Sequence, residues 1–224
     1  DYAVYALDHR GHGRSGGPRA NIDRFAYLVS DLGTFAGRAQ REHPGAPVFL
    51  LGHSMGGAVA LACALRYKGS LKGLALSAPA LATGEAVSSF KRLTLRLLSS
   101  LAPNTGALTL PATAISRDPA VVEAYEQDPL VFRGAIPART IVELLQAMDA
   151  FPASAPELRI PVLVQHGTAD TLVPLAATRP VYDLLGPPKA RTLRYYDGLF
   201  HEVYNEPERD RVIADLAAWI EARR

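Results

Sequence analysis

The chain has a single cysteine and lacks long apolar or charged runs. Cys63 cannot form an internal disulfide, and its apolar surroundings suit a small buried side chain. No apolar run reaches the roughly 18 residues that a membrane span requires. The net charge of +2, with no long basic run, excludes an obvious nucleic-acid partner. The remainder is an ordinary globular composition of 224 residues, 48% hydrophobic and 21% charged, which predicts one domain with an insertion.

Short apolar stretches predict strands, and apolar residues at helical spacing predict helices between them. The predicted strands are residues 2–7, 48–51, 71–77, 160–167 and 191–196. A helix is predicted over residues 25–41, and a last helix opens at Asn205, with Glu208 completing a capping box around Pro207. Strands that alternate with helices predict an α/β fold with a mostly parallel sheet covered on both faces.

Residues 80–158 interrupt this alternation, because they contain no convincing strand and predict two or three helices with proline-containing joints. Their position between two strands predicts a helical cap over the carboxyl edge of the sheet, with residues 1–79 and 159–224 forming the core. The first cap helix, residues 88–101, is rich in leucine and carries three basic residues. It either packs on the body or forms a partly exposed apolar lid that contacts a membrane or micelle surface.

The pattern Gly-x-Ser-x-Gly at residues 52–56 follows a predicted strand directly and opens a helix of small residues. This context is typical of a nucleophile elbow, in which a strained turn exposes the serine hydroxyl, rather than of an incidental serine. Gly52 and Gly56 are expected to let strand and helix approach without Cβ clashes. Ser54 is therefore the predicted nucleophile, and the backbone N–H of Met55 is one predicted donor to an oxyanion.

A serine hydroxyl needs a base that accepts its proton and a third group that orients the base. In hydrolases with this elbow, the acid and then the histidine follow the serine in the chain. Only His166 and His201 follow Ser54, and His166 closes a strand with no acid before it in a comparable place. His201, in the loop before the last helix, is the predicted base, and the alternative is a surface loop histidine.

The acid is expected in the loop after the preceding strand, where Asp170 follows residues 160–167. Asp183 and Asp197 are less suitable, since one is predicted on a helix and the other ends the next strand. The alternative for Asp170 is a turn-forming role. These three side chains predict catalysis through a covalent acyl-enzyme, with no cofactor, and no metal is expected because the histidines form no ligand-like pairs.

Together these motifs resemble the monoglyceride lipase and lysophospholipase branch of the α/β-hydrolases. The resemblance rests on residues 7–15, 52–57, 166–170 and 200–202, and in the cap on residues 115–119 and 125–130. It implies hydrolysis of one fatty acyl ester from glycerol, with a cap that shapes a tunnel for the acyl chain. A lysophospholipase or a broad carboxylesterase is the alternative, and a catalytically inactive hydrolase-like binding protein is the alternative outside the enzymes.

The resemblance also places Tyr125 on the alcohol side of the site, although a core tyrosine bonded within the cap is an equal alternative. Tyr204, one turn after His201, is a second predicted substrate contact, at a position where some family members have histidine. The partner expected is thus a small lipid ester, and the sequence leaves the oligomeric state open.

The second oxyanion donor is usually marked by His-Gly after an earlier strand, but the one His-Gly here, residues 166–167, precedes the predicted acid. The resemblance implies that an upstream strand is missing from this chain, which begins at Asp1 and not at methionine. We therefore expect a gap in the sheet, weak stability and little activity from these 224 residues alone. The expected location is the cytoplasm, with peripheral membrane association as an alternative and secretion left open.

Overall fold

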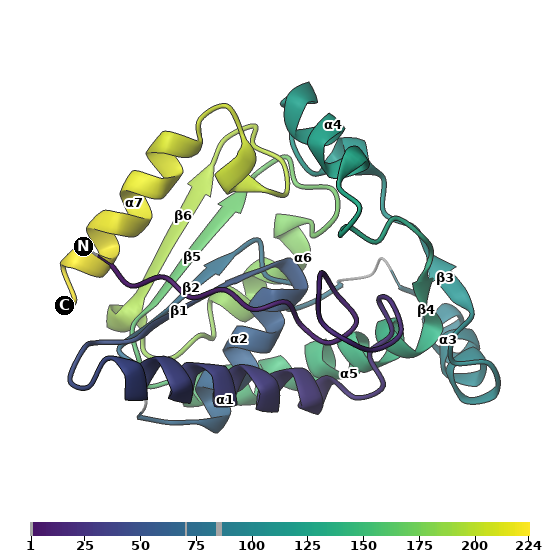
Figure 1. Ribbon diagram of the computed structural model, residues 1–224, viewed down its shortest axis with the longest axis horizontal. Coiled ribbons are helices and arrows are strands. Elements are labelled where there is room, and N and C mark those ends of the chain that lie inside the picture. The colour runs from purple at the N-terminus through teal and green to yellow at the C-terminus, as the bar shows by residue number, and fades with distance from the viewer. Residues whose placement is uncertain (1, 70, 84–86) are drawn as a thin grey trace.

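The computed structural model describes residues 2–69, 71–83 and 87–224, and is built around one parallel sheet (Figure 1). The strands are β1 (Phe49–His53), β2 (Gly73–Ser77), β5 (Val162–Gly167) and β6 (Arg191–Tyr196). They pair in the order β1-β2-β5-β6, and every pairing is parallel. The predicted α/β fold is therefore confirmed, and these four strands overlap the four predicted stretches from residue 48 onward.

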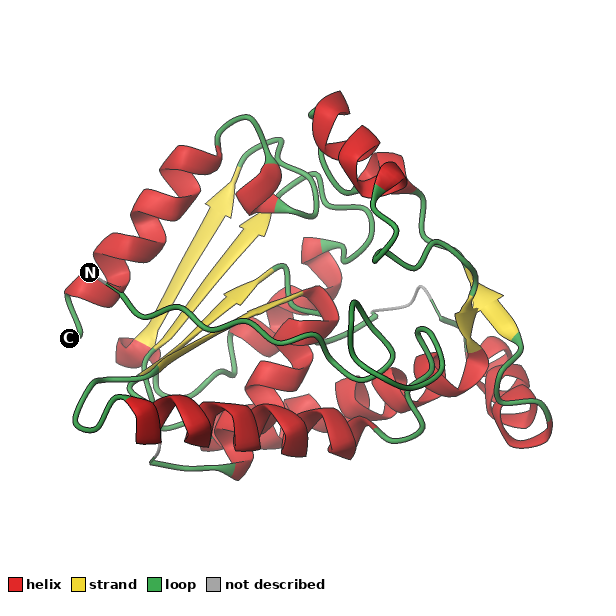
Figure 2. Ribbon diagram, viewed as in Figure 1, coloured by secondary structure: helices red, strands yellow, loops and turns green. Residues whose placement is uncertain are grey.

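Helices cover both faces of this sheet (Figure 2). They are α1 (Phe25–Glu42), α2 (Ser54–Arg66), α6 (Leu175–Tyr182) and α7 (Arg209–Glu221). Alternate side chains of β2 separate into two cores, because successive residues of a strand point to opposite faces. Leu74 and Leu76 pack with α1 and α2, whereas Ala75 packs with Trp219 of α7. All residues of β2 and β5 are buried, as expected for inner strands of a parallel sheet.

The segment between β2 and β5 contains three α-helices, as the spacing predicts: α3 (Ser89–Leu101), α4 (Pro119–Gln127) and α5 (Ala138–Ser154). It also contains a two-stranded antiparallel sheet, β3 (Gly106–Leu108) with β4 (Ile136–Pro137). This sheet was not expected, because two or three residues are too few to give an alternating pattern. Phe151 of α5 packs in the main core, so α5 belongs in part to the core and does not separate from it at a clear boundary. The cap boundaries at residues 80 and 158 therefore stay a proposal.

Short 3₁₀ turns complete the described structure. They are Ala112–Ala114, Ala155–Glu157, Pro188–Ala190 and Val203–Asn205. None of the helices in the described ranges is long and apolar enough to cross a bilayer. Cys63 lies buried in α2, and burial raises the pKa of its thiol to about 11, which keeps the thiol protonated and unreactive at neutral pH.

The predicted strand at residues 2–7 is wrong. These residues form no ladder with the sheet, and Val4 is 86% exposed. Within the described ranges, β1 pairs with β2 only and takes no second neighbour. A strand exists only where the backbone groups of a neighbour complete its hydrogen bonds, so high β-propensity in residues 2–7 is insufficient.

The predicted capping box of the last helix is also wrong, because α7 begins at Arg209 and Asn205 lies in a 3₁₀ turn. The side-chain amide of Asn205 donates to Glu202 at 2.7 Å instead of capping a helix. Glu208 forms an ion pair with Arg117. Asn205 is thus engaged within its own loop and Glu208 by a distant arginine, and neither caps the helix.

Candidate active site

Ser54 lies at the turn between β1 and α2 and has a φ of +52°, in the left-handed region that disfavours residues other than glycine. The predicted strain at this serine is therefore confirmed. Gly52 permits the turn, since a Cβ atom there would lie 2.4 Å from the carbonyl oxygen of Gly56 and 2.7 Å from Cβ of Ala60. The glycine two residues before the serine is thus needed for strand and helix to approach.

The expectation for Gly56 is wrong, because a Cβ atom there would meet nothing within 4 Å. The close approach is made one residue later, at Gly57, where a Cβ atom would lie 2.5 Å from Cβ of Pro79. Pro79 follows β2, whose neighbour is β1. The rotation of α2 turns position 57 toward this neighbouring strand and position 56 away from it.

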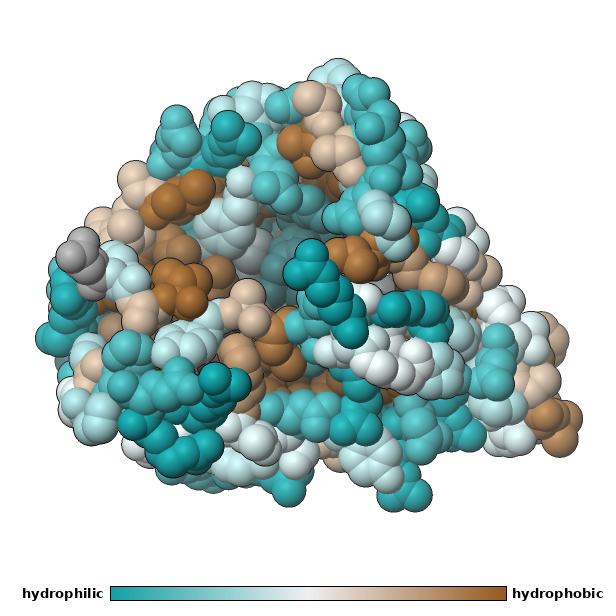
Figure 3. All heavy atoms as spheres, viewed as in Figure 1, coloured by the Kyte–Doolittle hydropathy of each residue, from teal (hydrophilic) through white to brown (hydrophobic). Residues whose placement is uncertain are grey.

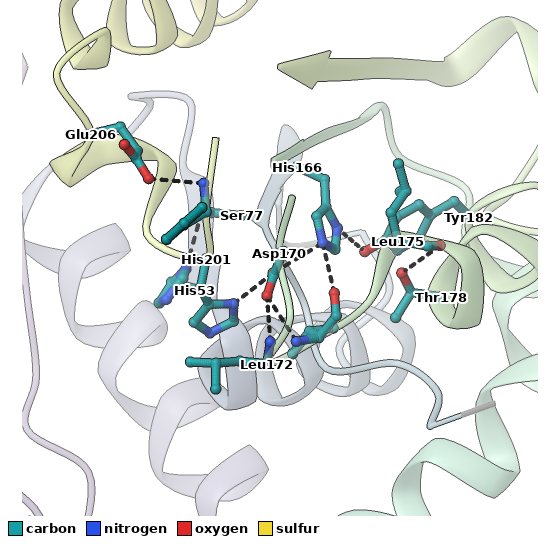
Figure 4. Close-up of polar contacts among 12 residues, drawn as sticks. His53, Ser77, His166, Asp170, Leu172, Leu175, Thr178, Tyr182, His201 and Glu206 are labelled. Carbon is teal, nitrogen blue, oxygen red and sulfur yellow. Dashed lines mark hydrogen bonds and ion pairs between the residues drawn. The ribbon is translucent and has the colours of Figure 1, made fainter. Parts of the chain in front are cut away.

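Asp170 and His201 form a buried pair in the loops that follow β5 and β6 (Figure 4). His201 Nδ1 lies 2.7 Å from Asp170 Oδ2, and their side chains are 7% and 0% exposed. The other carboxylate oxygen, Oδ1, accepts backbone N–H groups from Leu172 and Val173, both at 2.9 Å. A carboxylate accepts hydrogen bonds only, so Nδ1 of His201 carries a proton and Nε2 of the neutral ring is free to accept one.

His166 is a second histidine on the same carboxylate, and the sequence reasoning missed this role. Its Nε2 lies 3.1 Å from Asp170 Oδ2 and 2.9 Å from the carbonyl oxygen of Val173, while Nδ1 lies 2.7 Å from the Tyr182 hydroxyl. Both partners of Nε2 accept only, so Nε2 carries the proton. The spacing of four residues between His166 and Asp170 was the signal available.

Burial alone would raise the pKa of Asp170, but the hydrogen bonds from His166 and His201 and the charge of His201 outweigh burial. Together with the backbone N–H of Val173 they hold this pKa well below its usual range. Asp170 is therefore ionised at neutral pH. An ionised Asp170 can orient the His201 ring and would stabilise an imidazolium there.

His53, the residue directly before Ser54, packs against the predicted base. The ring centroids of His53 and His201 are 4.6 Å apart, and His53 Nδ1 lies 3.0 Å from Ser77 Oγ. Burial, and next the charge of His201, lowers the pKa of His53 to about 3, so His53 is neutral beside the base. The structure thus brings His201 to the residue adjacent to Ser54. Among the described contacts no hydrogen bond joins the Ser54 hydroxyl to His201, so the nucleophile–base pair remains a proposal.

Met55 occupies the first turn of α2, where backbone N–H groups have no partner within the helix. The helix N-terminus also carries a partial positive charge that favours an anion. This position suits the predicted role of Met55 as an oxyanion donor, which stays a prediction. In the described ranges, no group of three or more His, Cys, Asp or Glu side chains is arranged to hold a metal ion.

Tyr125, on α4, lines a cavity of about 220 Å³ in the segment between β2 and β5. The cavity is lined by Leu110, Ala112, Tyr125, Glu126, Phe132, Arg133, Gly134 and Ile136. Burial, and next the charge of Glu202, raises the pKa of Tyr125. Glu202 follows His201 directly, and the predicted contact of Tyr125 with substrate stays a prediction.

Tyr204 lies elsewhere. Its hydroxyl donates to the side-chain oxygen of Gln165, which is fully buried on β5, and its ring packs with Tyr196 and Val203. The hydroxyl is therefore used inside the core, and its predicted contact with substrate gains no support from this geometry.

The chain matches the family model described as serine aminopeptidase, S33, over residues 1–208. It is 42% identical over 217 residues to the monoacylglycerol lipase of Mycolicibacterium smegmatis, covering 97% of this chain and 77% of that protein. It is 34% identical over 228 residues to the monoglyceride lipase of Homo sapiens, covering 100% of this chain and 74% of that protein. The crystal structure of the Paleococcus ferrophilus monoacylglycerol lipase superposes with a TM-score of 0.87 at 27% identity, covering 99% of this chain and 84% of that one. The chain therefore belongs to the serine aminopeptidase S33 family and, within the α/β-hydrolases, to the monoglyceride lipase branch of the serine hydrolases.

Proposed function

We propose that the chain releases a fatty acid from monoacylglycerol, with Ser54 as nucleophile, His201 as base and Asp170 as the residue that orients the base. One observation carries the proposal: the buried His201–Asp170 pair, at 2.7 Å, packs beside the strained turn that presents Ser54. The names of the relatives supply the substrate class. The geometry supports acyl transfer to a serine as the reaction type.

In the first half of the reaction, His201 Nε2 accepts the Ser54 proton while Oγ forms a bond to the ester carbonyl carbon. The negative charge that develops on the carbonyl oxygen is stabilised by the backbone N–H of Met55. The bond to the glycerol oxygen then breaks, and the imidazolium of His201 gives its proton to the leaving alcohol. Asp170 stays ionised throughout, because its hydrogen bonds hold its pKa low.

In the second half, a water molecule takes the place of glycerol and attacks the acyl-enzyme. His201 accepts one proton from this water and returns it to Ser54 Oγ as the acyl bond breaks. The products are a fatty acid and the free enzyme, so no cofactor enters the balance. The neutral His53 ring beside His201 adds no charge that would oppose formation of the imidazolium.

For the alcohol part of the substrate we assign the cavity beside Tyr125. Its volume of about 220 Å³ lies below the range of roughly 300–1,000 Å³ typical of sites for whole small molecules, so it suits a fragment such as glycerol. The phenol of Tyr125 and the charged groups of Glu126 and Arg133 supply hydrogen-bonding partners for hydroxyl groups.

We further infer that α3 contacts a lipid surface, from which a monoacylglycerol substrate would enter. Phe90, Leu93, Leu97 and Leu101 recur at helical spacing and are each more than half exposed. The opposite side of α3 packs through Leu95 on α5, which supports both alternatives considered for residues 88–101. Brown atoms mark the protruding lower right end of the molecule in Figure 3, where Figure 1 places α3.

A fluorophosphonate probe, applied to the full-length form of the protein, tests the nucleophile, since it labels activated serines covalently. Labelling is expected in the parent protein and in the control Ser154→Ala, whose half-buried hydroxyl donates, among the described contacts, to the carbonyl oxygen of Ala150 in its own helix. It is expected to vanish in Ser54→Ala. Rates on monoolein, lysophosphatidylcholine and p-nitrophenyl butyrate then test the substrate class. A preference for lysophosphatidylcholine or for the short ester would overturn the monoacylglycerol assignment, and labelling that survives in Ser54→Ala would overturn the nucleophile.

A further inference from the structure

The side chain of Glu206 is 0% exposed and lies between the cap segment and the loop that carries His201. Its carboxylate accepts three hydrogen bonds. Oε1 accepts the backbone N–H groups of Phe200, at 2.8 Å, and of Arg117, at 3.3 Å. Oε2 accepts Nε of Arg117 at 2.9 Å. Burial of a carboxylate is unfavourable unless such partners compensate the lost hydration. Glu206 therefore depends on these partners, unlike a charge in a solvated surface ion pair.

Phe200 directly precedes His201, so the contact fixes the backbone at the predicted base. Figure 4 shows Glu206 bonded to this backbone while His201 reaches Asp170 on its other side. The backbone N–H of Phe200 holds one end of a short segment, and the Nδ1–Oδ2 bond of 2.7 Å holds the imidazole. Displacing the backbone at residue 200 would therefore move the His201 ring away from the carboxylate.

The same loop is joined to the cap at two more points. The backbone N–H of Glu202 donates to the carbonyl oxygen of Ile115 at 2.8 Å, and Ser116 Oγ donates to the carbonyl oxygen of Asn205 at 3.0 Å. Residues 115–117 thus run along the His201 loop from residue 200 to residue 206. These residues belong to the cap motif that supported the family resemblance, and the reaction steps above give them no role.

The motif continues directly into α4. Asp118, the N-cap residue of α4, accepts the backbone N–H of Ala120 at 2.9 Å. Helix α4 carries Tyr125, which lines the cavity assigned to the alcohol. One ion pair therefore connects the helix that lines the substrate cavity with the loop that holds the base.

We propose that Glu206 is a positioning residue, which together with Arg117 fixes the His201 loop against the cap so that the imidazole stays aligned between Asp170 and Ser54. The inference rests on the proposed function through the role of His201. Loss of the ion pair is expected to slow the chemical step, because misplacing a catalytic group by about 1 Å can lower a rate about 10²-fold. It is not expected to weaken the binding of an ester too small to reach the cap.

Glu206→Gln tests the proposal with little change in shape. The amide oxygen can still accept the N–H of Phe200, but the amide nitrogen then faces Arg117 Nε, and two donors cannot bond. Arg117→Gln is the second variant, on a side chain that is 34% exposed and so less demanding for folding. Glu208→Gln is the matched control, since Glu208 also pairs with Arg117 but is 47% exposed and has no described side-chain contact with the His201 loop.

Two measurements separate positioning from general structural damage. With p-nitrophenyl butyrate, kcat is expected to fall about 10- to 100-fold in both test variants with KM unchanged, and to stay at the parent value in Glu208→Gln. The far-downfield proton NMR resonance of the His201 Nδ1–H is expected in the parent and in Glu208→Gln, and shifted or lost in both test variants. Thermal unfolding of each variant identifies any that fails to fold.

Parent-like kcat and an unchanged resonance in folded Glu206→Gln and Arg117→Gln would overturn the proposal. Equal losses in Glu208→Gln would overturn it too, because the effect would then follow any charge near Arg117. The failure of the proposed function has a different signature: labelling that survives in Ser54→Ala, or a preference for lysophosphatidylcholine over monoolein. Neither result alters the resonance, which reports the His201–Asp170 bond in any substrate class.

Discussion

Replacing Asp170 by asparagine tests the acid–base pair, because the structure dictates how the amide must lie. Oδ1 of Asp170 accepts two backbone N–H groups at 2.9 Å, from Leu172 and Val173. The asparagine must keep its oxygen there, since an NH₂ group would face two donors. Its Nδ2 then takes the place of Oδ2, facing His201 Nδ1 at 2.7 Å and His166 Nε2 at 3.1 Å.

This orientation reverses the tautomer of the base. His201 Nδ1 must now accept from the amide, so the proton moves to Nε2, which can no longer receive the Ser54 proton. Loss of the correct tautomer in a serine triad lowers kcat about 10⁴-fold. That factor corresponds to about 5.4 kcal/mol of activation free energy. Binding of the substrate does not involve Asp170, so KM is expected to stay near the parent value.

The assay is hydrolysis of p-nitrophenyl butyrate by the parent and by Asp170→Asn, with circular dichroism and thermal unfolding as checks on folding. Asp197→Asn is the matched control, because Asp197 accepts a hydrogen bond from Thr168 Oγ1 at 3.1 Å and has no described contact with His201. The control is expected to keep parent activity. Retention of a tenth or more of parent kcat by a folded Asp170→Asn would refute the tautomer argument, as would an equal loss in Asp197→Asn.

Three further outcomes follow from the described contacts. Gly52→Ala is expected to lower the free energy of unfolding by about 1–3 kcal/mol or more, because its Cβ would lie 2.4 Å from a backbone oxygen. Gly56→Ala has open space and is expected to be neutral or to stabilise α2 by up to about 1 kcal/mol. Urea unfolding of both variants measures the difference, and equal losses would contradict the packing argument. The folded state holds the pKa of Asp170 below its unfolded value, so its contribution to stability is present above about pH 4 and is lost as pH falls toward the folded pKa. The difference in free energy of unfolding between the parent and Asp170→Asn should therefore narrow toward acid pH. A constant difference would contradict the direction of the pKa shift. The double variant Leu93→Glu/Leu97→Glu is expected to bind phosphatidylcholine vesicles less well in co-sedimentation and to hydrolyse less of the monoolein in them. Its hydrolysis of p-nitrophenyl butyrate is expected to stay unchanged. Undiminished vesicle binding would contradict the lipid-contact role of α3.

The sequence brings residues together most directly where their position along the chain determines their position in space. Ser54, Asp170 and His201 each follow a strand of one parallel sheet, and the carboxyl ends of parallel strands meet at one edge. Their order and spacing were therefore enough to bring Asp170 to His201. The glycines of the elbow show the same contrast. Gly52 is required by atoms of its own turn and was predicted, whereas Gly57 is required by Pro79 of a neighbouring segment and was not predicted.

The local sequence pattern does not predict which charged side chains are buried. Two glutamates near the start of α7 show why. Glu208 fits a capping box by its spacing from Asn205, yet the structure places it 47% exposed against Arg117. Glu206, two residues earlier, has no local signal at all and is fully buried, bonded to the backbone beside the base. Both pair with the same arginine, Arg117, about ninety residues away in the cap segment. What distinguishes them is that Glu206 also accepts the backbone N–H of Phe200 and is enclosed there. The role of a buried charge in this fold is therefore fixed by its tertiary partners, and the Arg117 and Glu206 variants measure that dependence directly.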